Sequence, residues 1–195
     1  ISPDGKFAYL VRLSDSNPLS GYSIDALNGS LSPIAGFTAP SGLESSIKIT
    51  ISSVGYFPPL YFALIIENGL FNKGPIRCYN INSNTGVITT LLDNYDTGLA
   101  PSDISAIGNL IYVANGNNSS NPGANSISGY KLVSSGLSYN FTDISGSPWA
   151  TDKTSPTSVA MTPDRKYLYA VCKNGTDGHI AGFNINTSGN STDSS

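Results

Sequence analysis

The sequence predicts an all-β fold, a β-propeller built from four-stranded antiparallel blades. Three observations favour it. A strand motif recurs along the 195 residues, each period holds four short strand signals separated by Gly, Pro, Asn or Asp, and no window of ten or more residues has helical periodicity. Units of four strands that repeat every ~40–50 residues are typical of propeller blades, which stack around an axis because one blade cannot bury both of its faces.

Two independent aromatic anchors define the repeat. One recurs at separations of 57, 51 and 53 residues, and its members are Tyr22, Tyr79, Tyr130 and Phe183. The other recurs at separations of 53, 50 and 57 residues, and its members are Tyr9, Phe62, Tyr112 and Tyr169. The lengths differ because surface loops absorb insertions.

The repeat divides the chain into blades over residues 1–41, 42–98, 99–153 and 154–185. The first unit lacks the pattern of an inner strand, and the last ends after its third strand. Residues 186–195 are rich in Ser, Asn and Thr, which predicts a disordered polar tail. Four units could also close a four-bladed ring, but with an inner strand missing at one end and an outer strand at the other we expect about four blades of a larger ring.

Composition limits the classes of partner. Net charge is −3 and the ten Lys and Arg are scattered, which argues against nucleic acid. The longest apolar run, near Leu60–Ile66, is too short for a transmembrane segment. Only 12% of residues are charged, and the abundance of Ser, Asn, Thr and Gly favours an extracytoplasmic location.

Seven Asn-x-Ser/Thr sequons are candidate glycosylation sites if the protein is secreted by a eukaryote, although a chain this rich in Asn, Ser and Thr also produces them by chance. They are Asn28, Asn117, Asn118, Asn140, Asn174, Asn186 and Asn190. The two cysteines, Cys78 and Cys172, lie in different repeats, and we expect buried free thiols rather than a disulfide. The sequence has no Cys/His cluster and no cofactor fingerprint, so neither a metal nor a cofactor is predicted.

Three segments, SPDGKFAYL, GYSIDALNGSLSPIAG and PTSVAMTPDRKYLYAV, resemble the lactonase-like β-propeller family, which includes propeller-type 6-phosphogluconolactonase with YVTN-like repeats. The resemblance implies seven blades with the Pro-x-Ser-Ile strand innermost. It also implies a catalytic His with Glu and Arg on inner strands. The matching positions here hold Ser102, Asp103, Thr157 and Ser158, so a lactonase site is expected only on blades outside this segment.

His179 and Asp177 are the weak catalytic candidates. Histidine acts as a general base near neutral pH, and Asp177 could orient it. Both residues are expected in the loop between the second and third strands of the last repeat. A solvated hairpin without a catalytic role is the simpler interpretation.

Asp103 and Arg77 are the weak ligand-binding candidates. Asp103 replaces a small or apolar residue beside an inner strand, where it would face the channel, and a local hydrogen bond to the backbone is the alternative. Arg77 would anchor a substrate or, as a charge on an edge strand, block sheet-to-sheet pairing. Trp149 is expected to pack between blades.

These patterns favour a non-catalytic, extracytoplasmic propeller that acts as a binding or assembly module, with protein or glycan partners on its ring-face loops. One alternative is a lactonase-type hydrolase whose catalytic site lies on other blades. A structural repeat of a surface layer or large assembly is the other alternative.

Overall fold

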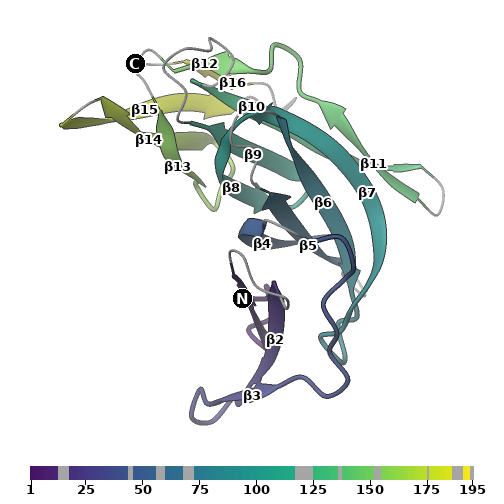
Figure 1. Ribbon diagram of the computed structural model, residues 1–195. Coiled ribbons are helices and arrows are strands. Elements are labelled where there is room, and N and C mark those ends of the chain that lie inside the picture. Colours follow the sequence, from purple (N-terminus) through teal and green to yellow (C-terminus); the bar gives the residue numbers. More distant parts are fainter. Residues whose placement is uncertain are drawn as a thin grey trace.

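The computed structural model describes residues 1–12, 18–43, 46–55, 60–67, 73–116, 125–135, 138–151, 155–174, 176–185 and 191–193. These residues form four antiparallel sheets that follow one another along an arc, and none of them is helical (Figure 1). The prediction of an all-β fold with antiparallel blades is confirmed.

Each sheet is one blade. Blade 1 contains β1 (Phe7–Val11), β2 (Leu19–Ile24) and β3 (Leu31–Pro33). Blade 2 contains β4 (Ser46–Val54), β5 (Leu60–Glu67), β6 (Lys73–Ile81) and β7 (Ile88–Leu99). Blade 3 contains β8 (Pro101–Ile107), β9 (Leu110–Asn115), β10 (Ser126–Ser135), β11 (Ser138–Asp143) and the short β12 (Trp149–Ala150). Blade 4 contains β13 (Pro156–Met161), β14 (Tyr167–Asn174), β15 (Asp177–Ile185) and β16 (Ser191–Asp193).

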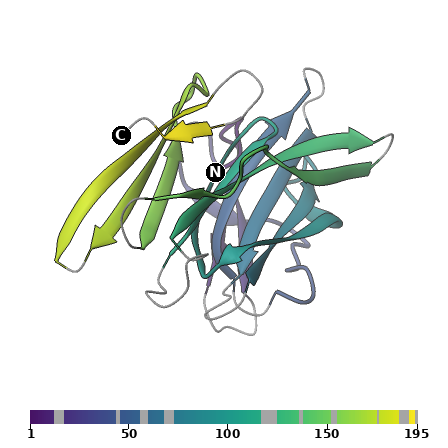
Figure 2. The same cartoon turned by 90° about the horizontal axis from the view of Figure 1, so that it is seen from above.

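Consecutive strands are neighbours within every blade, apart from the short β12, which pairs with β10. The first strands of blades 2, 3 and 4, which we call the inner strands, lie on the concave side of the arc, and β7 and β11 lie on the convex side (Figure 1). β8 contacts both β4 and β13. Seen from above, the sheets stand beside one another as separate layers (Figure 2).

The tail prediction is wrong at Ser191–Asp193. These residues form β16 and pair with Phe183–Ile185 of β15, so blade 4 has a fourth strand. Strand pairing satisfies backbone N–H and C=O groups and does not require apolar side chains. The polar composition of this segment therefore gave no signal for the strand. Residues 186–190 and 194–195 lie outside the described part.

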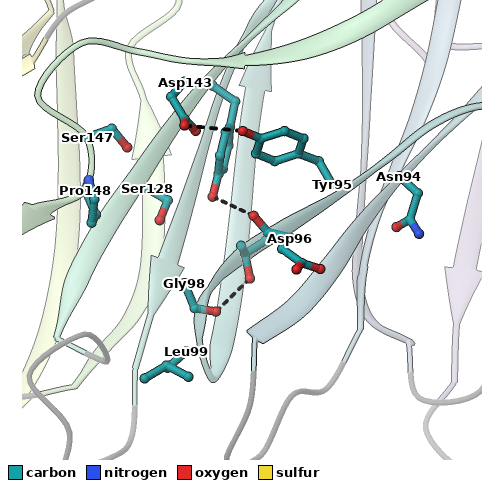
Figure 3. Close-up of a pocket in the computed structure, with 11 residues that line it drawn as sticks. Asn94, Tyr95, Asp96, Gly98, Leu99, Ser128, Asp143, Ser147 and Pro148 are labelled. Atoms are coloured by element: carbon teal, nitrogen blue, oxygen red, sulfur yellow. Dashed lines mark hydrogen bonds between the residues drawn. The ribbon is translucent and has the colours of Figure 1, made fainter.

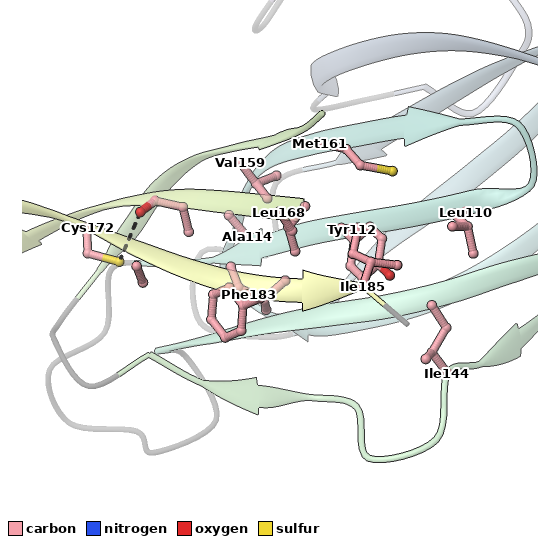
Figure 4. Close-up of a cluster of buried hydrophobic side chains, with 13 residues drawn as sticks. Leu110, Tyr112, Ala114, Ile144, Val159, Met161, Leu168, Cys172, Phe183 and Ile185 are labelled. Carbon is pink, nitrogen blue, oxygen red and sulfur yellow. Dashed lines mark hydrogen bonds between the residues drawn. The ribbon is translucent and has the colours of Figure 1, made fainter. Parts of the chain in front are cut away.

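Three apolar cores fill the spaces between consecutive blades. β9 shows how one strand serves two of them, because successive side chains point to opposite faces. Ile111 and Val113 belong to the core between blades 2 and 3, whereas Tyr112 and Ala114 belong to the core between blades 3 and 4 (Figure 4). All four are fully buried, so this strand has no solvent-facing side.

Both cysteines and the tryptophan belong to this inter-blade packing. Cys78 lies in the core between blades 2 and 3, Cys172 in that between blades 3 and 4, and both are free thiols, as predicted. Burial raises the pKa of the Cys78 thiol to about 12 and also raises the pKa of Cys172. Trp149 packs against the core between blades 3 and 4, its ring 6.2 Å from that of Tyr112.

We expect both thiols to be unreactive in the folded protein, because the reactive species is the thiolate and burial disfavours it. Ellman's reagent at pH 8 should detect no thiol in the native protein and two thiols in the denatured protein. Rapid labelling of Cys78 in the native protein would contradict the buried placement.

Gly86 and Gly29 provide a matched test of the packing between blades 1 and 2. Each ends the same kind of turn, with φ of +73°, and each donates its N–H to the carbonyl four residues earlier. A Cβ on Gly86 would clash with the Phe7 ring, whereas a Cβ on Gly29 would meet nothing within 4 Å. Urea unfolding should show a loss of about 1 kcal/mol for Gly29→Ala and about 2–4 kcal/mol for Gly86→Ala, because only the latter adds overpacking to backbone strain. Equal losses would mean that Phe7 does not seal this interface.

Candidate functional site

The three inner strands share one irregularity near their first residues. In each, the register with the second strand of the blade shifts by one residue. The residue that follows the shift is Lys48 in β4, Asp103 in β8 and Ser158 in β13, and consecutive members are 55 residues apart. β-Bulges redirect side chains. Three neighbouring blades therefore present equivalent positions, which we call the inner-strand row.

Asp103 contacts both other members of the inner-strand row. Its Oδ1 lies 3.1 Å from Nζ of Lys48. Its Oδ2 accepts hydrogen bonds from Oγ of Ser158 at 2.7 Å and from the backbone N–H of Val159 at 3.0 Å. The N–H of Ile104 donates to Oδ1 at 2.9 Å. One carboxylate thus connects blades 2, 3 and 4, and the local backbone bond expected for Asp103 is only one of its four contacts.

Burial divides the row into a structural and an accessible part. The Asp103 side chain is 7% exposed, whereas the Lys48 side chain is 53% exposed and Ser158 is also exposed. A buried carboxylate must be paired and hydrogen-bonded to be tolerated, and this one is. The chemistry that the row offers to a ligand is therefore the ammonium of Lys48 and the hydroxyl of Ser158, rather than the carboxylate.

The neighbouring hydroxyls bind backbone. Ser102 Oγ donates to the carbonyl oxygens of Pro156, at 2.7 Å, and Ala114, at 3.2 Å. Thr157 Oγ1 donates to the carbonyl of Val171 at 3.3 Å. These hydrogen bonds hold the bulges of β8 and β13 against adjacent backbone. They explain why a Ser or Thr follows the first Pro of each of these two inner strands.

The edge-strand interpretation of Arg77 is wrong. Arg77 lies in β6, which pairs with β5 on one side and β7 on the other. Its Nε lies 3.0 Å from Oε1 of buried Glu67, at the same end of blade 2 as Lys48. Burial alone would lower the pKa of Arg77, but the hydrogen bond and charge of Glu67 outweigh it and raise that pKa. Arg77 therefore compensates the buried charge of Glu67.

His179 and Asp177 lie in β15 rather than in a loop, because the hairpin is tighter than the sequence suggested. His179 is partly buried opposite Cys172, and Asp177 is exposed opposite Asn174. β15 is the third strand of blade 4, so the structure does not bring either residue to the inner-strand row.

The sequons fall in different environments. Asn28, in the turn between β2 and β3, and Asn140, in β11, are exposed. Asn174 ends β14. The remaining four candidates, Asn117, Asn118, Asn186 and Asn190, lie outside the described residues.

A second candidate site is a pocket of about 680 Å³ between β7 and β10, which we call the outer pocket (Figure 3). Asp96 and Asp143 bring carboxylates to it, and Tyr95 and Tyr130 bring aromatic rings 5.4 Å apart. Tyr95 Oη donates to Asp143 Oδ2 at 3.3 Å, and Tyr130 Oη donates to the Asp96 carbonyl at 3.4 Å.

Electrostatics make the outer pocket suited to neutral hydroxylated or cationic groups. Burial raises the pKa of Tyr130 to about 12, and burial together with the nearby aspartates raises the pKa of Tyr95. Both phenols are therefore neutral at physiological pH. No basic side chain is present among the described residues that line this pocket.

Within the described ranges, no three His, Cys, Asp or Glu side chains are grouped in a way that would hold a metal ion. The described residues also include no helix suited to crossing a bilayer.

Comparison with known proteins relates the fold to lactonase propellers. No family model and no curated protein matches the sequence. Among solved structures, the periplasmic gluconolactonase of Pseudomonas aeruginosa matches 100% of this chain and 55% of its own length, with a TM-score of 0.60 and 10% identity. A Bacteroides fragilis protein described as a candidate 6-phosphogluconolactonase matches 100% of this chain and 68% of its own, with a TM-score of 0.54 and 17% identity. Hydrazine synthase of Kuenenia stuttgartiensis matches 92% of this chain and 56% of its own length, with a TM-score of 0.51 and 15% identity.

At these identities the likeness concerns the fold, and hydrazine synthase illustrates that this fold serves unrelated chemistry. The chain spans about half the length of the gluconolactonase. The chain has the β-propeller fold of lactonase-like proteins.

The inner-strand row predicts unequal effects of removing its two charges. Asp103→Ala leaves the buried N–H of Val159 without its acceptor, so urea unfolding should show a loss of about 2–4 kcal/mol. Lys48→Met removes a half-exposed partner and should cost less than about 1 kcal/mol. Similar small losses for both variants would show that Asp103 does not connect the blades.

Proposed function

We propose that the propeller to which these blades belong is a lactonase-type hydrolase acting on a sugar lactone. The observation that carries the proposal is the match of the whole chain to two lactonase-like propellers, at TM-scores of 0.60 and 0.54. This proposal takes precedence over the non-catalytic module favoured by the sequence, because missing catalytic residue types in this segment do not bear on other blades. In this proposal the ring has seven blades.

Lactone hydrolysis defines what the blades have to supply. The oxygen of water bonds to the lactone carbonyl carbon, the ring C–O bond breaks, and the ring oxygen takes a proton, which gives a hydroxy acid. Negative charge develops on the carbonyl oxygen, and fixed cations or N–H donors stabilise it. We propose that Lys48 adds one such charge to a site whose other catalytic residues lie on the remaining blades, because its half-exposed ammonium lies on an inner strand and is paired with Asp103.

We also propose an extracytoplasmic location. The low content of charged residues and the periplasmic gluconolactonase among the structural neighbours support it.

A binding module remains a second candidate function, and the outer pocket favours it. Aromatic rings beside carboxylates are groups that bind hydroxylated ligands such as glycans. In this alternative the ligand lies between β7 and β10, away from the inner strands.

Hydrolysis of glucono-δ-lactone by the full-length protein, followed by acid release, tests the proposal. The wild type should exceed the spontaneous rate, and Lys48→Met should lower kcat by about 10- to 100-fold with little change in stability. Lys6→Met, which removes an exposed cation paired with Asp4 in blade 1, is the control and should retain activity. An absence of turnover above the spontaneous rate would refute the hydrolase, and retained binding of oligosaccharides would then favour the binding module.

A further inference from the structure

The turn before β14 reproduces the turn before β1. In the first, Thr162 Oγ1 donates to Asp164 Oδ1 at 2.6 Å, and the Lys166 N–H donates to the same oxygen at 3.1 Å. In the second, the corresponding bonds join the hydroxyl of Ser2 and the N–H of Lys6 to Asp4 Oδ1, at 2.6 and 3.2 Å. The two turns are therefore equivalent.

They differ at one position. Residue 5 is glycine, with φ of +74°, and the equivalent residue is Arg165, with φ of +59°. This left-handed conformation is strained for a residue with a Cβ and is easily adopted by glycine. The turn before β1 forms with glycine at this position, so the Arg165 side chain is not needed to form the turn. The left-handed backbone at residue 165 in fact disfavours any residue with a Cβ.

The Arg165 side chain instead reaches the neighbouring blade. Its Nη1 lies 3.2 Å from the position that a Cβ on Gly108 would occupy, so the guanidinium lies over the β8–β9 turn. There it lines a pocket of about 480 Å³, which we call the turn pocket. The pocket lies beside the last residues of β4, at the opposite ends of the inner strands from the inner-strand row.

The lining of the turn pocket is suited to an anion. Arg165 is the only charged side chain among the described residues that line it, and Ser53, Asn109 and Tyr139 add polar groups. The adjacent Asp164 accepts hydrogen bonds from Thr162 and Lys166, pairs with the Lys166 ammonium and does not line the pocket. The Tyr139 ring is held edge-on against Phe62, with centroids 5.1 Å apart, and offers a flat apolar surface.

We propose that the turn pocket binds a small hydroxylated anion, such as a sugar phosphate or a sugar acid. The Arg165 guanidinium takes the phosphate or carboxylate through paired N–H donors, a geometry for which arginine is better suited than lysine. The Tyr139 ring packs against the carbon skeleton, and Ser53 and Asn109 bind hydroxyl groups. This site is separate from the inner-strand row, and the proposal does not depend on lactone hydrolysis.

Calorimetric binding to the full-length protein tests the proposal, with glucose 6-phosphate, gluconate and inorganic phosphate as probes. Arg165→Gly should bind them at least about tenfold more weakly. It should melt at the same or a higher temperature, because glycine adopts the left-handed turn without strain. Lys166→Gln, which removes a cation that lies next to Arg165 but outside the lining, should bind like the wild type.

The probes distinguish the source of the anion. Tighter binding of glucose 6-phosphate assigns the site to phosphates, and tighter binding of gluconate assigns it to carboxylates. Arg165→Gln, which keeps a long side chain on the turn, repeats the test if Arg165→Gly melts lower than expected. Unchanged affinity in folded Arg165→Gly or Arg165→Gln, or no saturable binding by the wild type, would overturn the proposal. Because no lactone is present, the result is independent of hydrolysis.

Discussion

The burial of both faces of β5 and β9, the second strands of blades 2 and 3, by the blades on either side is the constraint on which this structure depends. A four-stranded sheet that is apolar on both sides cannot be stable alone in water, because it would expose too much apolar surface. β9 is buried along all of its six residues, and its two faces contribute to two different cores. The blades are therefore a single stacked unit rather than independent domains.

Stacking the apolar faces also fixes the polar groups of the inner strands. Once blades 2, 3 and 4 are packed, the same bulge in each places Lys48, Asp103 and Ser158 side by side. The carboxylate of Asp103 is removed from water by this packing and is compensated by partners from both neighbouring blades. Polar geometry at the concave side is thus a consequence of apolar packing behind it.

The two ends of the inner strands carry different chemistry. The bulged end presents the Lys48 ammonium, held by Asp103, and is the part of these blades that we connect with lactone hydrolysis. The opposite end carries tight turns, and there Arg165 reaches over Gly108 of the next blade. A propeller separates these ends by the length of its inner strand, so one ring has room for two independent sites.

The sequence by itself determined the strands, their period and the turns, because side-chain alternation and turn residues such as Pro3, Asp4 and Gly5 act locally. It also identified the free thiols correctly. It failed for β16, whose pairing depends on the backbone, and for Arg77, whose strand is interior only because β7 covers it.

Only the tertiary structure decided which side chains meet. The 55-residue spacing of Lys48, Asp103 and Ser158 was present in the sequence, but a spacing does not show that charges from three blades converge. Tyr95 of β7 and Asp143 of β11, both at the outer pocket, likewise meet only because their strands lie in stacked blades. Local preferences fix each strand, whereas contacts between strands of different blades arise from packing over the whole arc.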